Sequence, residues 1–478
     1  FDRLAIEHFG IPGLDLMERA GQAAFDLIRR RWPDAGRLVV LAGTGNNGGD
    51  GFVVARLAHE AGLQVQVLQL GDRGRLRGDA QHNAERWRQS GALWSDFRSL
   101  PDAVDVIVDA MLGTGLERTV GGLWADAIAA ANAHRAPCLA IDLPSGLHAD
   151  SGAVLGDAIR ASATISFIGL KLGLFTADGS DCAGDVHFDG LGVPAAVYAS
   201  SPPSARRLDW QKQAGLLGPR RRNVHKGHFG HVLVIGGNQG MGGAPRLAAE
   251  AALRTGGGLV SLATRPEHVA PVLAARPEIM VRGVVDPGQL QPLLRQASVV
   301  ALGPGLGQDD WAHAVWQLAI GAGRPLVVDA DALRLLAAEP SLRDDWVLTP
   351  HPGEAAALLG VCGAEVNAQR FDAADQIQRR FGGCVVLKGA GSIIASAGSV
   401  PPAVCSEGNP GMASGGMGDA LTGVIAGLLA QGLDLRDAAE GGFCLHAAAA
   451  DVAARAGGER GLLASDVVAE LRGLVNLG

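Results

Sequence analysis

Residues 38–51 read LVVLAGTGNNGGDG, a short apolar run followed by a turn rich in glycine and asparagine. Gly43, Gly45 and Gly48 match the spacing GxGxxG, which in α/β proteins joins a buried strand to a helix N-terminus that binds a pyrophosphate. A tight strand-to-helix turn needs glycine for packing alone, so further motifs must decide the function. One alternative is an oxidoreductase, because Asp72 follows the next apolar run, where dehydrogenases place an acidic residue.

Apolar runs alternate with helical patterns on both sides of this stretch. Continuous runs of Val, Ile and Leu are typical of parallel strands buried on both faces, and the spacing fits βαβ units. In the first block the runs are Leu38–Leu41, Val65–Leu70, Val104–Val108, Cys138–Ile141 and Thr164–Ile168, with helical patterns at Phe52–Ala61 and Leu123–Ala133. In the second block they are Val232–Ile235, Leu259–Ala263, Val299–Leu302, Leu326–Val328, Val347–Thr349 and Cys384–Leu387.

A stretch rich in Ser, Pro and Arg separates the two blocks: residues 198–210 read YASSPPSARRLDW. This composition is typical of a linker. The 478-residue length also indicates more than one domain. We therefore predict an α/β protein with two domains, residues 1–205 and residues 206–478, that share an architecture but no sequence repeat.

The composition excludes several classes of protein. The net charge of −8 gives no basic field, so we expect small-molecule ligands and no nucleic acid. No apolar run is long enough to span a bilayer, and we expect no membrane partner. The six cysteines are scattered without a CxxC pair, so we expect neither a disulfide framework nor a thiolate zinc site. A cytoplasmic homo-oligomer is the expected form.

Two more motifs follow apolar runs of the first block. Residues 109–120 read DAMLGTGLERTV, and residues 142–150 read DLPSGLHAD. Loops at the carboxyl ends of parallel strands converge on the ligand, so these motifs and the glycine-rich turn should meet. In this order the three motifs resemble the YjeF N-terminal domain, the NAD(P)H-hydrate epimerase family, which implies a Rossmann-like α/β sandwich.

The resemblance implies roles for individual residues. Asp142 would handle the proton at the reacting ring carbon, and an ionised carboxylate can act as a base. A K⁺ ion would be held by Asn47, Asp109 and Ser145, whose oxygen ligands suit a hard cation. Contacts to the hydrated dinucleotide are implied for Asn46, Asn47, Gly48, Gly49, Asp50, Gly113, Thr114, Gly115, Leu116, Glu117, Arg118, Thr119 and Asp142.

Two alternatives concern single side chains of this block. Ser145 could be a hydrolase nucleophile, although no GxSxG elbow surrounds it. Lys171 could stabilise developing charge, or it could be an ordinary surface lysine.

The second block ends in residues 409–419, NPGMASGGMGD, followed by an apolar helical pattern over Ala420–Ala430. Gly415, Gly416 and Gly418 leave backbone N–H groups free at a helix N-terminus, where they can hold a transferring phosphoryl group. Asp419 would then lie near an attacking hydroxyl. The histidines at 225, 228 and 231 raise the alternative of a zinc site, but no Cys or carboxylate accompanies them.

Together with HKGxxG (225–230), GPGLG (303–307), DADAL (329–333), TPHPGE (349–354) and KGAGS (388–392), this motif resembles the NAD(P)H-hydrate dehydratase family. The resemblance implies a ribokinase-like α/β domain with Asp419 as its catalytic base and a Mg²⁺ ion. Contacts to the hydrated cofactor are implied for Ala244, Gly305, Gly307, His351 and Asp419. ADP or AMP contacts are implied for Lys388, Gly389, Ala390, Gly391, Ser392 and Gly418.

The two resemblances imply one bifunctional enzyme of nicotinamide nucleotide repair. The first domain would epimerise the R and S forms of hydrated NADH and NADPH. The second would dehydrate the S form using ADP, with ATP as the alternative, releasing AMP or ADP and phosphate. A true small-molecule kinase and a non-catalytic nucleotide sensor are the rival hypotheses, although a degenerate sensor site would be expected to lose Asp142, Asp109 or Asn47.

Overall fold

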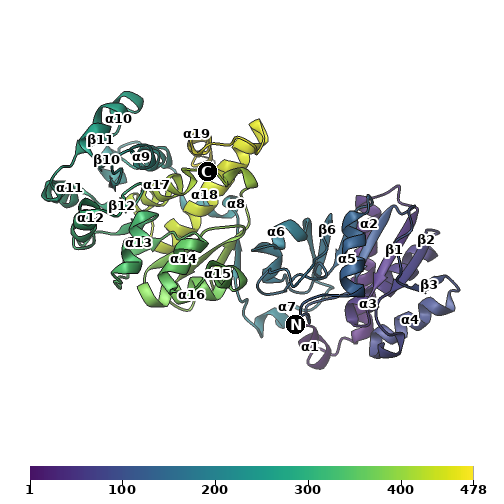
Figure 1. Cartoon of the computed structure of the whole chain (residues 1–478). Coiled ribbons are helices and arrows are strands. Elements are labelled where there is room, and N and C mark those ends of the chain that lie inside the picture. The colour runs from purple at the N-terminus through teal and green to yellow at the C-terminus, as the bar shows by residue number, and fades with distance from the viewer. Residues whose placement is uncertain (477–478) are drawn as a thin grey trace. The chain divides into compact units, whose positions relative to one another are not determined.

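Every strand of the N-terminal unit runs parallel to its neighbours (Figure 1). The computed structural model describes residues 1–476, and the chain divides into two units between Pro203 and Ser204. The first sheet has the order β3-β2-β1-β4-β5-β6-β7. Its strands are β1 (Arg37–Ala42), β2 (Gln64–Gln69), β3 (Leu93–Asp96), β4 (Val106–Ala110), β5 (Cys138–Ile141), β6 (Ala163–Phe167) and β7 (Asp185–Asp189).

Helices cover both faces of this sheet because its strands are apolar on both sides. Leu38 and Val40 pack with α2, α3 and α4, whereas Val39 and Leu41 pack with α5 on the opposite face. The helices are α1 (Asp2–Glu7), α2 (Gly13–Arg31), α3 (Asn46–Glu60), α4 (Gly78–Gln89), α5 (Leu123–Ala133), α6 (Gly179–Cys182) and α7 (Ala195–Ala199).

The C-terminal unit has a ten-stranded mixed sheet of order β11-β10-β9-β12-β13-β14-β15-β16-β17-β8. Strands from β11 to β15 are parallel, and β16 is antiparallel to both of its neighbours. The strands are β8 (Arg206–Leu208), β9 (His231–Ile235), β10 (Leu259–Thr264), β11 (Met280–Gly283), β12 (Val299–Leu302), β13 (Leu326–Val328), β14 (Trp346–Leu348), β15 (Cys384–Leu387), β16 (Ser392–Ser396) and β17 (Ala403–Cys405).

Alternate residues of β9 again face two helical layers. Val232 and Val234 pack with α9, α17, α18 and α19, and Leu233 and Ile235 pack with the layer of α12, α13, α14 and α16. The helices are α8 (Trp210–Gln213), α9 (Gly243–Thr255), α10 (Val269–Ala275), α11 (Gln291–Gln296), α12 (Asp310–Ile320), α13 (Asp331–Ala338), α14 (Pro352–Leu359), α15 (Gly363–Ala368), α16 (Arg370–Phe381), α17 (Met417–Ala430), α18 (Leu435–Gly457) and α19 (Ala464–Leu474).

The predicted α/β class with two domains is confirmed, but the predicted linker 198–210 contains regular structure. Arg206–Leu208 forms β8, which pairs with β17 at the edge of the second sheet. Three residues are too few to show an alternating pattern, so the sequence alone could not reveal this strand.

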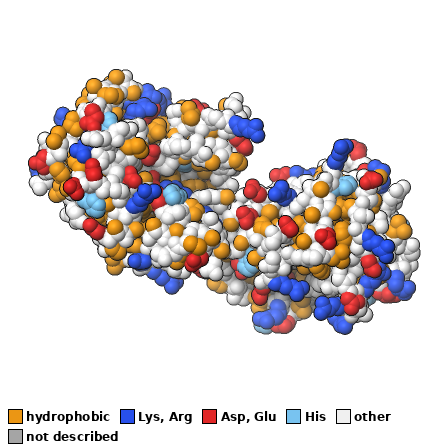
Figure 2. Space-filling model, in the orientation of Figure 1, with side chains coloured by type: hydrophobic (Ala, Val, Ile, Leu, Met, Phe, Trp, Pro, Cys, Tyr) orange, Lys and Arg blue, Asp and Glu red, His pale blue; other side chains and the backbone are white. Residues whose placement is uncertain are grey.

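No helix among residues 1–476 is long and apolar enough to cross a membrane. On the face that Figure 2 shows, basic and acidic side chains are interspersed over the surface.

Candidate active sites

The strand order of the first sheet reverses at β1, which pairs with β2 on one side and β4 on the other. In open parallel sheets the ligand binds in the crevice at the carboxyl ends of such strands. The segment after β1 is the NNGGD sequence, which forms the first turn of α3 with Gly45 as its N-cap. The segments after β4 and β5 are the other two predicted motifs. The topology therefore brings all three motifs to one place.

A cavity of about 1110 Å³ lies at this position. The predicted contacts that line it are Asn46, Asn47, Asp50, Gly113, Thr114, Gly115, Leu116, Glu117, Arg118 and Asp142. Gly48, Gly49 and Thr119 are not among the lining residues. Gly48 and Gly49 are buried, and a Cβ atom there would lie 2.2 Å from the Gly43 carbonyl oxygen and 2.6 Å from the Met17 sulfur, respectively. Glycine at both positions allows the first turn of α3 to pack closely against the turn after β1 and against α2.

Asp109 lies at the end of β4 and is completely buried. Its carboxylate accepts the Ser145 hydroxyl at 2.6 Å and the Ser145 amide at 2.7 Å. Burial raises the pKa of Asp109 to about 6, although the bonds from Ser145 act in the opposite direction. Asn47 Nδ2 donates to the Leu112 carbonyl at 3.0 Å, while the buried Asn47 Oδ1 accepts no hydrogen bond. A buried carboxylate beside an unsatisfied amide oxygen forms an oxygen-rich set that fits a monovalent cation.

Asp142 follows β5 and faces the cavity in a left-handed backbone conformation, with φ of +65°. Its carboxylate forms an ion pair with Lys171. The Lys171 ammonium also donates to the Ser166 hydroxyl and to the Phe167 carbonyl, both at 3.1 Å. Lys171 is therefore fixed against Asp142, and both can act on the same bound group.

The predicted contact Asp50 is half-buried, and burial and the charge of Asp142 raise its pKa. Several other lining residues were not identified from the sequence. Arg75, Asp79 and Trp124 line the cavity as well. They lie outside the glycine motifs, so no local signal marked them.

Two alternatives from the sequence lose support here. Asp72 Oδ1 accepts the Gly74 amide at 2.8 Å and is not among the cavity residues, so it does not resemble the ribose-binding acid of a dehydrogenase. Ser145 is buried with its hydroxyl bound to Asp109, which does not suit a nucleophile.

The second sheet reverses its strand order at β9, which pairs with β10 and β12. Ala244 lies in the first turn of α9, which follows β9. Gly305 follows β12 with φ of +58°, and a Cβ atom there would lie 3.4 Å from the Ala244 Cβ. These two predicted contacts are therefore neighbours. The amide of Gly307 instead donates to Asp331 at 2.8 Å, which fixes the turn.

Lys388, which follows β15, lies near carboxylates from the residue after β13 and from the first turn of α14. Its ammonium lies 2.6 Å from Asp329 Oδ1 and 3.7 Å from Glu354 Oε2. Burial lowers the pKa of Lys388, but the charges of Asp329 and Glu354 outweigh it and raise the pKa above its usual value. Thr422 of α17 donates to Asp329 Oδ2 at 2.9 Å. Asp329 and Glu354 belong to quoted motifs, yet their contact with Lys388 could not be read from spacing.

His351 is the N-cap of α14 and is half exposed. Its Nδ1 accepts the Gly353 amide at 3.0 Å and the Glu354 amide at 3.2 Å. This leaves Nε2, which lies 3.4 Å from Glu354 Oε1, as the nitrogen available to carry a proton. His351 is thereby tied to the carboxylate that faces Lys388.

The predicted glycine nest forms the start of α17. Gly416 is the N-cap in a left-handed conformation, and a Cβ atom at Gly418 would lie 3.3 Å from the Lys388 ammonium. Asp419 lies in the first turn of this helix. Burial raises the pKa of Asp419 to about 6, and the charge of Asp329 adds to the rise. A helix N-terminus, a lysine and a carboxylate with a shifted pKa therefore meet at one point.

The predicted nucleotide segment 388–392 is a turn between β15 and β16. Ser392 is buried, and its hydroxyl donates to the Gly389 carbonyl at 3.0 Å. Arg370 of α16 donates to the carbonyls of Leu387, Lys388 and Gly391 at 3.3–3.4 Å. Arg370, which the sequence did not single out, therefore holds the turn in shape.

Two other features of this unit lie apart from these residues. His225 and His228 face each other with ring centroids 3.8 Å apart, whereas His231 Nε2 lies 2.8 Å from the Ser261 hydroxyl. Within residues 1–476 the three histidines are not part of any group of three possible metal ligands. A cavity of about 670 Å³ lined in part by Arg220, Glu250 and Arg472 contains none of the predicted site residues.

Two α/β domains whose predicted site residues follow the carboxyl ends of strands are the arrangement of a two-domain α/β enzyme. The family described as YjeF-related protein N-terminus matches residues 13–173, and the family described as NAD(P)H-hydrate dehydratase matches residues 232–472. The bifunctional NAD(P)H-hydrate repair enzyme Nnr of Coxiella burnetii is 48% identical over 99% of this chain and 97% of its own length. The Escherichia coli enzyme of the same name is 45% identical, over 99% and 92% respectively. The chain belongs to the family of bifunctional NAD(P)H-hydrate repair enzymes.

Solved structures resemble the C-terminal unit. A ribokinase-like superfamily protein from Enterococcus faecalis has 30% identity and a TM-score of 0.54, covering 57% of this chain and 96% of its own. The ADP/ATP-dependent NAD(P)H-hydrate dehydratase of Bacillus subtilis, co-crystallised with ATP and Mg²⁺, has 26% identity and a TM-score of 0.50, covering 56% and 97%. The predicted ribokinase-like fold of this unit is confirmed.

Proposed function

We propose that the N-terminal unit interconverts the R and S epimers of hydrated NADH and NADPH, and that the C-terminal unit dehydrates the S epimer with ADP. The observation that carries the proposal is Asp419, a carboxylate with a raised pKa at the N-terminus of α17 beside Lys388. That arrangement suits proton removal from a hydroxyl while phosphate charge is stabilised.

In the N-terminal unit, Asp142 takes up the proton at the reacting ring carbon and returns it on either face. Lys171 holds the carboxylate in position and stabilises charge that develops nearby. Asn47, Asp109 and Ser145 would hold K⁺, which would neutralise the buried Asp109 charge and fix the loops on either side of the substrate. The free Asn47 Oδ1 supports this ligand set.

In the C-terminal unit, the substrate hydroxyl attacks the terminal phosphorus of ADP and Asp419 accepts its proton. The amides at the start of α17 and the Lys388 ammonium stabilise the phosphate charge. The ring nitrogen lone pair then expels phosphate, and loss of a proton from the neighbouring ring carbon to water gives NAD(P)H beside AMP and phosphate. The carboxylates of Asp329 and Glu354 offer the hard oxygen ligands that Mg²⁺ prefers, and bound Mg²⁺ would neutralise phosphate charge.

The test is to incubate the full-length protein with mixed hydrated NADPH epimers, with and without ADP, and to follow reduced-nicotinamide absorbance. We expect both epimers to be converted with ADP and neither without it. Conversion of only one epimer would contradict the epimerase assignment, and conversion without nucleotide would contradict the phosphoryl-transfer step. Replacing ADP with ATP tests the choice of nucleotide.

Compartment and assembly stay predictions. A cytoplasmic location is supported by six cysteines that are all free thiols. The expected homo-oligomer is tested by light scattering of the full-length protein.

A further inference from the structure

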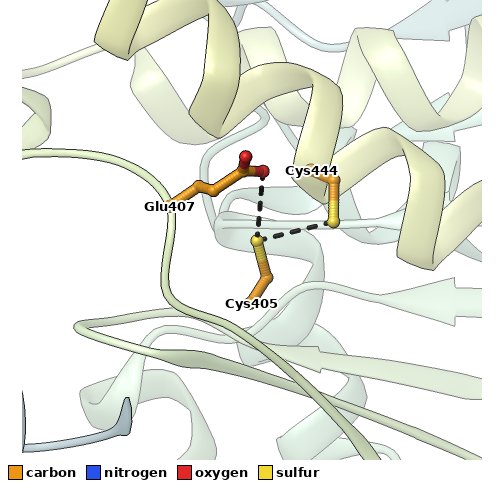
Figure 3. Close-up of side chains that lie close together, drawn as sticks. All are labelled: Cys405, Glu407 and Cys444. Atoms are coloured by element: carbon orange, nitrogen blue, oxygen red, sulfur yellow. Dashed lines mark hydrogen bonds between the residues drawn. The ribbon is translucent and has the colours of Figure 1, made fainter. Parts of the chain in front are cut away.

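Three side chains of the C-terminal unit form a cluster outside the sites described above (Figure 3). Cys405 is the last residue of β17, Glu407 lies two residues later, and Cys444 lies in the middle of α18. The two sulfurs are 3.4 Å apart, and Cys405 Sγ lies 3.8 Å from Glu407 Oε2. Both thiols are completely buried. Because the cysteines are 39 residues apart in the chain, their spacing did not reveal this cluster.

The distances between the ligand atoms of the cluster are close to those in a tetrahedral zinc site. Zinc lies about 2.3 Å from thiolate sulfur and about 2.1 Å from carboxylate oxygen in a tetrahedral site. These lengths require sulfurs about 3.8 Å apart and a sulfur–oxygen distance of about 3.6 Å. The observed 3.4 and 3.8 Å are close to these values, and all three ligand atoms lie within 4.8 Å of one another.

We propose that Cys405, Cys444 and Glu407 bind one Zn²⁺ ion, with water in the fourth position. Two Zn–S bonds and one Zn–O bond form, and the two thiols release their protons to water. Two thiolates and a carboxylate then carry three negative charges against the two positive charges of zinc. The net charge equals that of two neutral thiols beside one carboxylate, so zinc adds no charge to the core.

Neighbouring groups hold the Glu407 carboxylate and the two residues after it in place. The Trp210 amide donates to Glu407 Oε2 at 2.8 Å. Asp451, further along α18, accepts the Gly408 amide at 3.0 Å and Asn409 Nδ2 at 2.9 Å. Bound zinc would therefore link β17 to α18 at the start of the segment 409–419, which carries the glycine nest. Its role is structural, because no predicted substrate contact belongs to the cluster.

The test uses the full-length protein, reduced, freed of metal with a chelator and titrated with Zn²⁺ against a chromophoric chelator. We expect one tightly bound Zn²⁺ per chain, and Co²⁺ in its place should give thiolate-to-cobalt charge-transfer absorption. Cys405→Ala and Cys444→Ala should each weaken zinc binding by more than the ~10–100-fold that loss of an outer-shell partner costs. Glu407→Gln should weaken it as well.

The matched controls are Cys384→Ala, which removes a buried thiol outside the cluster, and His225→Ala, which breaks the exposed histidine pair. Both should keep the wild-type zinc affinity. Unchanged affinity in Cys444→Ala would overturn the proposal. So would a Cys405–Cys444 disulfide, identified by mass spectrometry in protein isolated without reductant. If the cluster variants fail to fold, the wild-type Co²⁺ spectrum decides, because absence of thiolate absorption also refutes the site.

Discussion

Asp142 occupies a left-handed backbone conformation that Asp and Asn tolerate better than most side chains. Asp142→Asn should therefore keep the local fold while losing the ability to take up a proton. Epimer interconversion should fall by ~10²–10⁴, and ADP-dependent repair of the S epimer should be unchanged. Chromatographic separation of the two epimers over time measures both effects. Near-normal interconversion would show that the proton is handled elsewhere, with Lys171 the next candidate.

Asp419 sets the expected pH dependence of dehydration. Its pKa is raised to about 6, and only the ionised form can accept the hydroxyl proton. The dehydration rate should therefore fall as the pH drops through about 6 and level off above it. Measuring kcat/KM for dehydration across this range tests the expectation. A rate that is constant through pH 6 would contradict Asp419 as the base.

Asp419→Asn keeps the size of the side chain but cannot accept the proton. Phosphate release and cofactor regeneration should fall together by ~10²–10⁴, while ADP binding survives through residues 388–392. Parallel phosphate and absorbance assays check this, with ADP affinity measured by calorimetry. Loss of ADP affinity would mean that Asp419 chiefly organises the loop or its metal. A stable phosphoester from the wild-type enzyme would support a kinase instead.

The buried Asp109 should make the N-terminal unit sensitive to cations. A ligand that binds only the folded state stabilises it, so K⁺ should raise the unfolding temperature above that in tetramethylammonium at equal ionic strength. Asp109→Asn removes the charge and should abolish this difference. Thermal unfolding in the two salts is the measurement. Equal unfolding temperatures for the wild-type protein would argue against the potassium site.

At the scale of elements, α9 and α17 pack closely because α17 has glycine at the contact. A Cβ atom at Gly423 would lie 2.0 Å from the Ala248 carbonyl oxygen. Gly423→Ala should therefore destabilise the C-terminal unit by about 1–3 kcal/mol. In Gly473→Ala the new methyl group meets nothing within 4 Å, and the change should stabilise α19 by up to ~1 kcal/mol. Urea unfolding of the two variants compares these effects, and equal shifts would contradict the packing argument.

Most buried parallel strands could be predicted from the sequence, whereas polar edge strands and the short buried strands β16 and β17 could not. The runs at 138–141, 299–302, 326–328 and 384–387 match β5, β12, β13 and β15, since strands covered on both faces are apolar throughout. Edge strands such as β3 and β7 carry polar residues, and so they were missed. The first turn of α3 was also missed. NNGGD has a low intrinsic helix propensity, which tertiary packing overrides.

The candidate sites also contain residues that the sequence could predict and contacts that it could not. Asp142, Asp109 and Asp419 lie in contiguous motifs at strand or helix ends, where local sequence marks them. The contacts of Lys388 with Asp329, and of Arg370 with the 388–392 turn, join segments that are distant in the chain. Such pairs depend on strand order, which one sequence does not specify.

The whole molecule should be separable into its two units, since each has its own sheet and core. Residues 206–478 expressed alone should be folded and should repair the S epimer only. Adding residues 1–205 as a second chain should restore repair of the R epimer. Circular dichroism and the absorbance assay check both steps. A fragment that is insoluble, or that needs the first unit for any turnover, would contradict independent domains.

The pairing of β8 with β17 has a consequence for biosynthesis. Arg206 and Ala403 are register partners, but roughly 200 residues must be translated between them. At 5–20 residues per second, a ribosome needs ~10–40 s for this stretch. The N-terminal unit can fold during that interval, while the β8 segment has no partner strand to pair with. Its two arginines then have a protective role, because charged residues on an unpaired strand oppose aggregation between nascent chains.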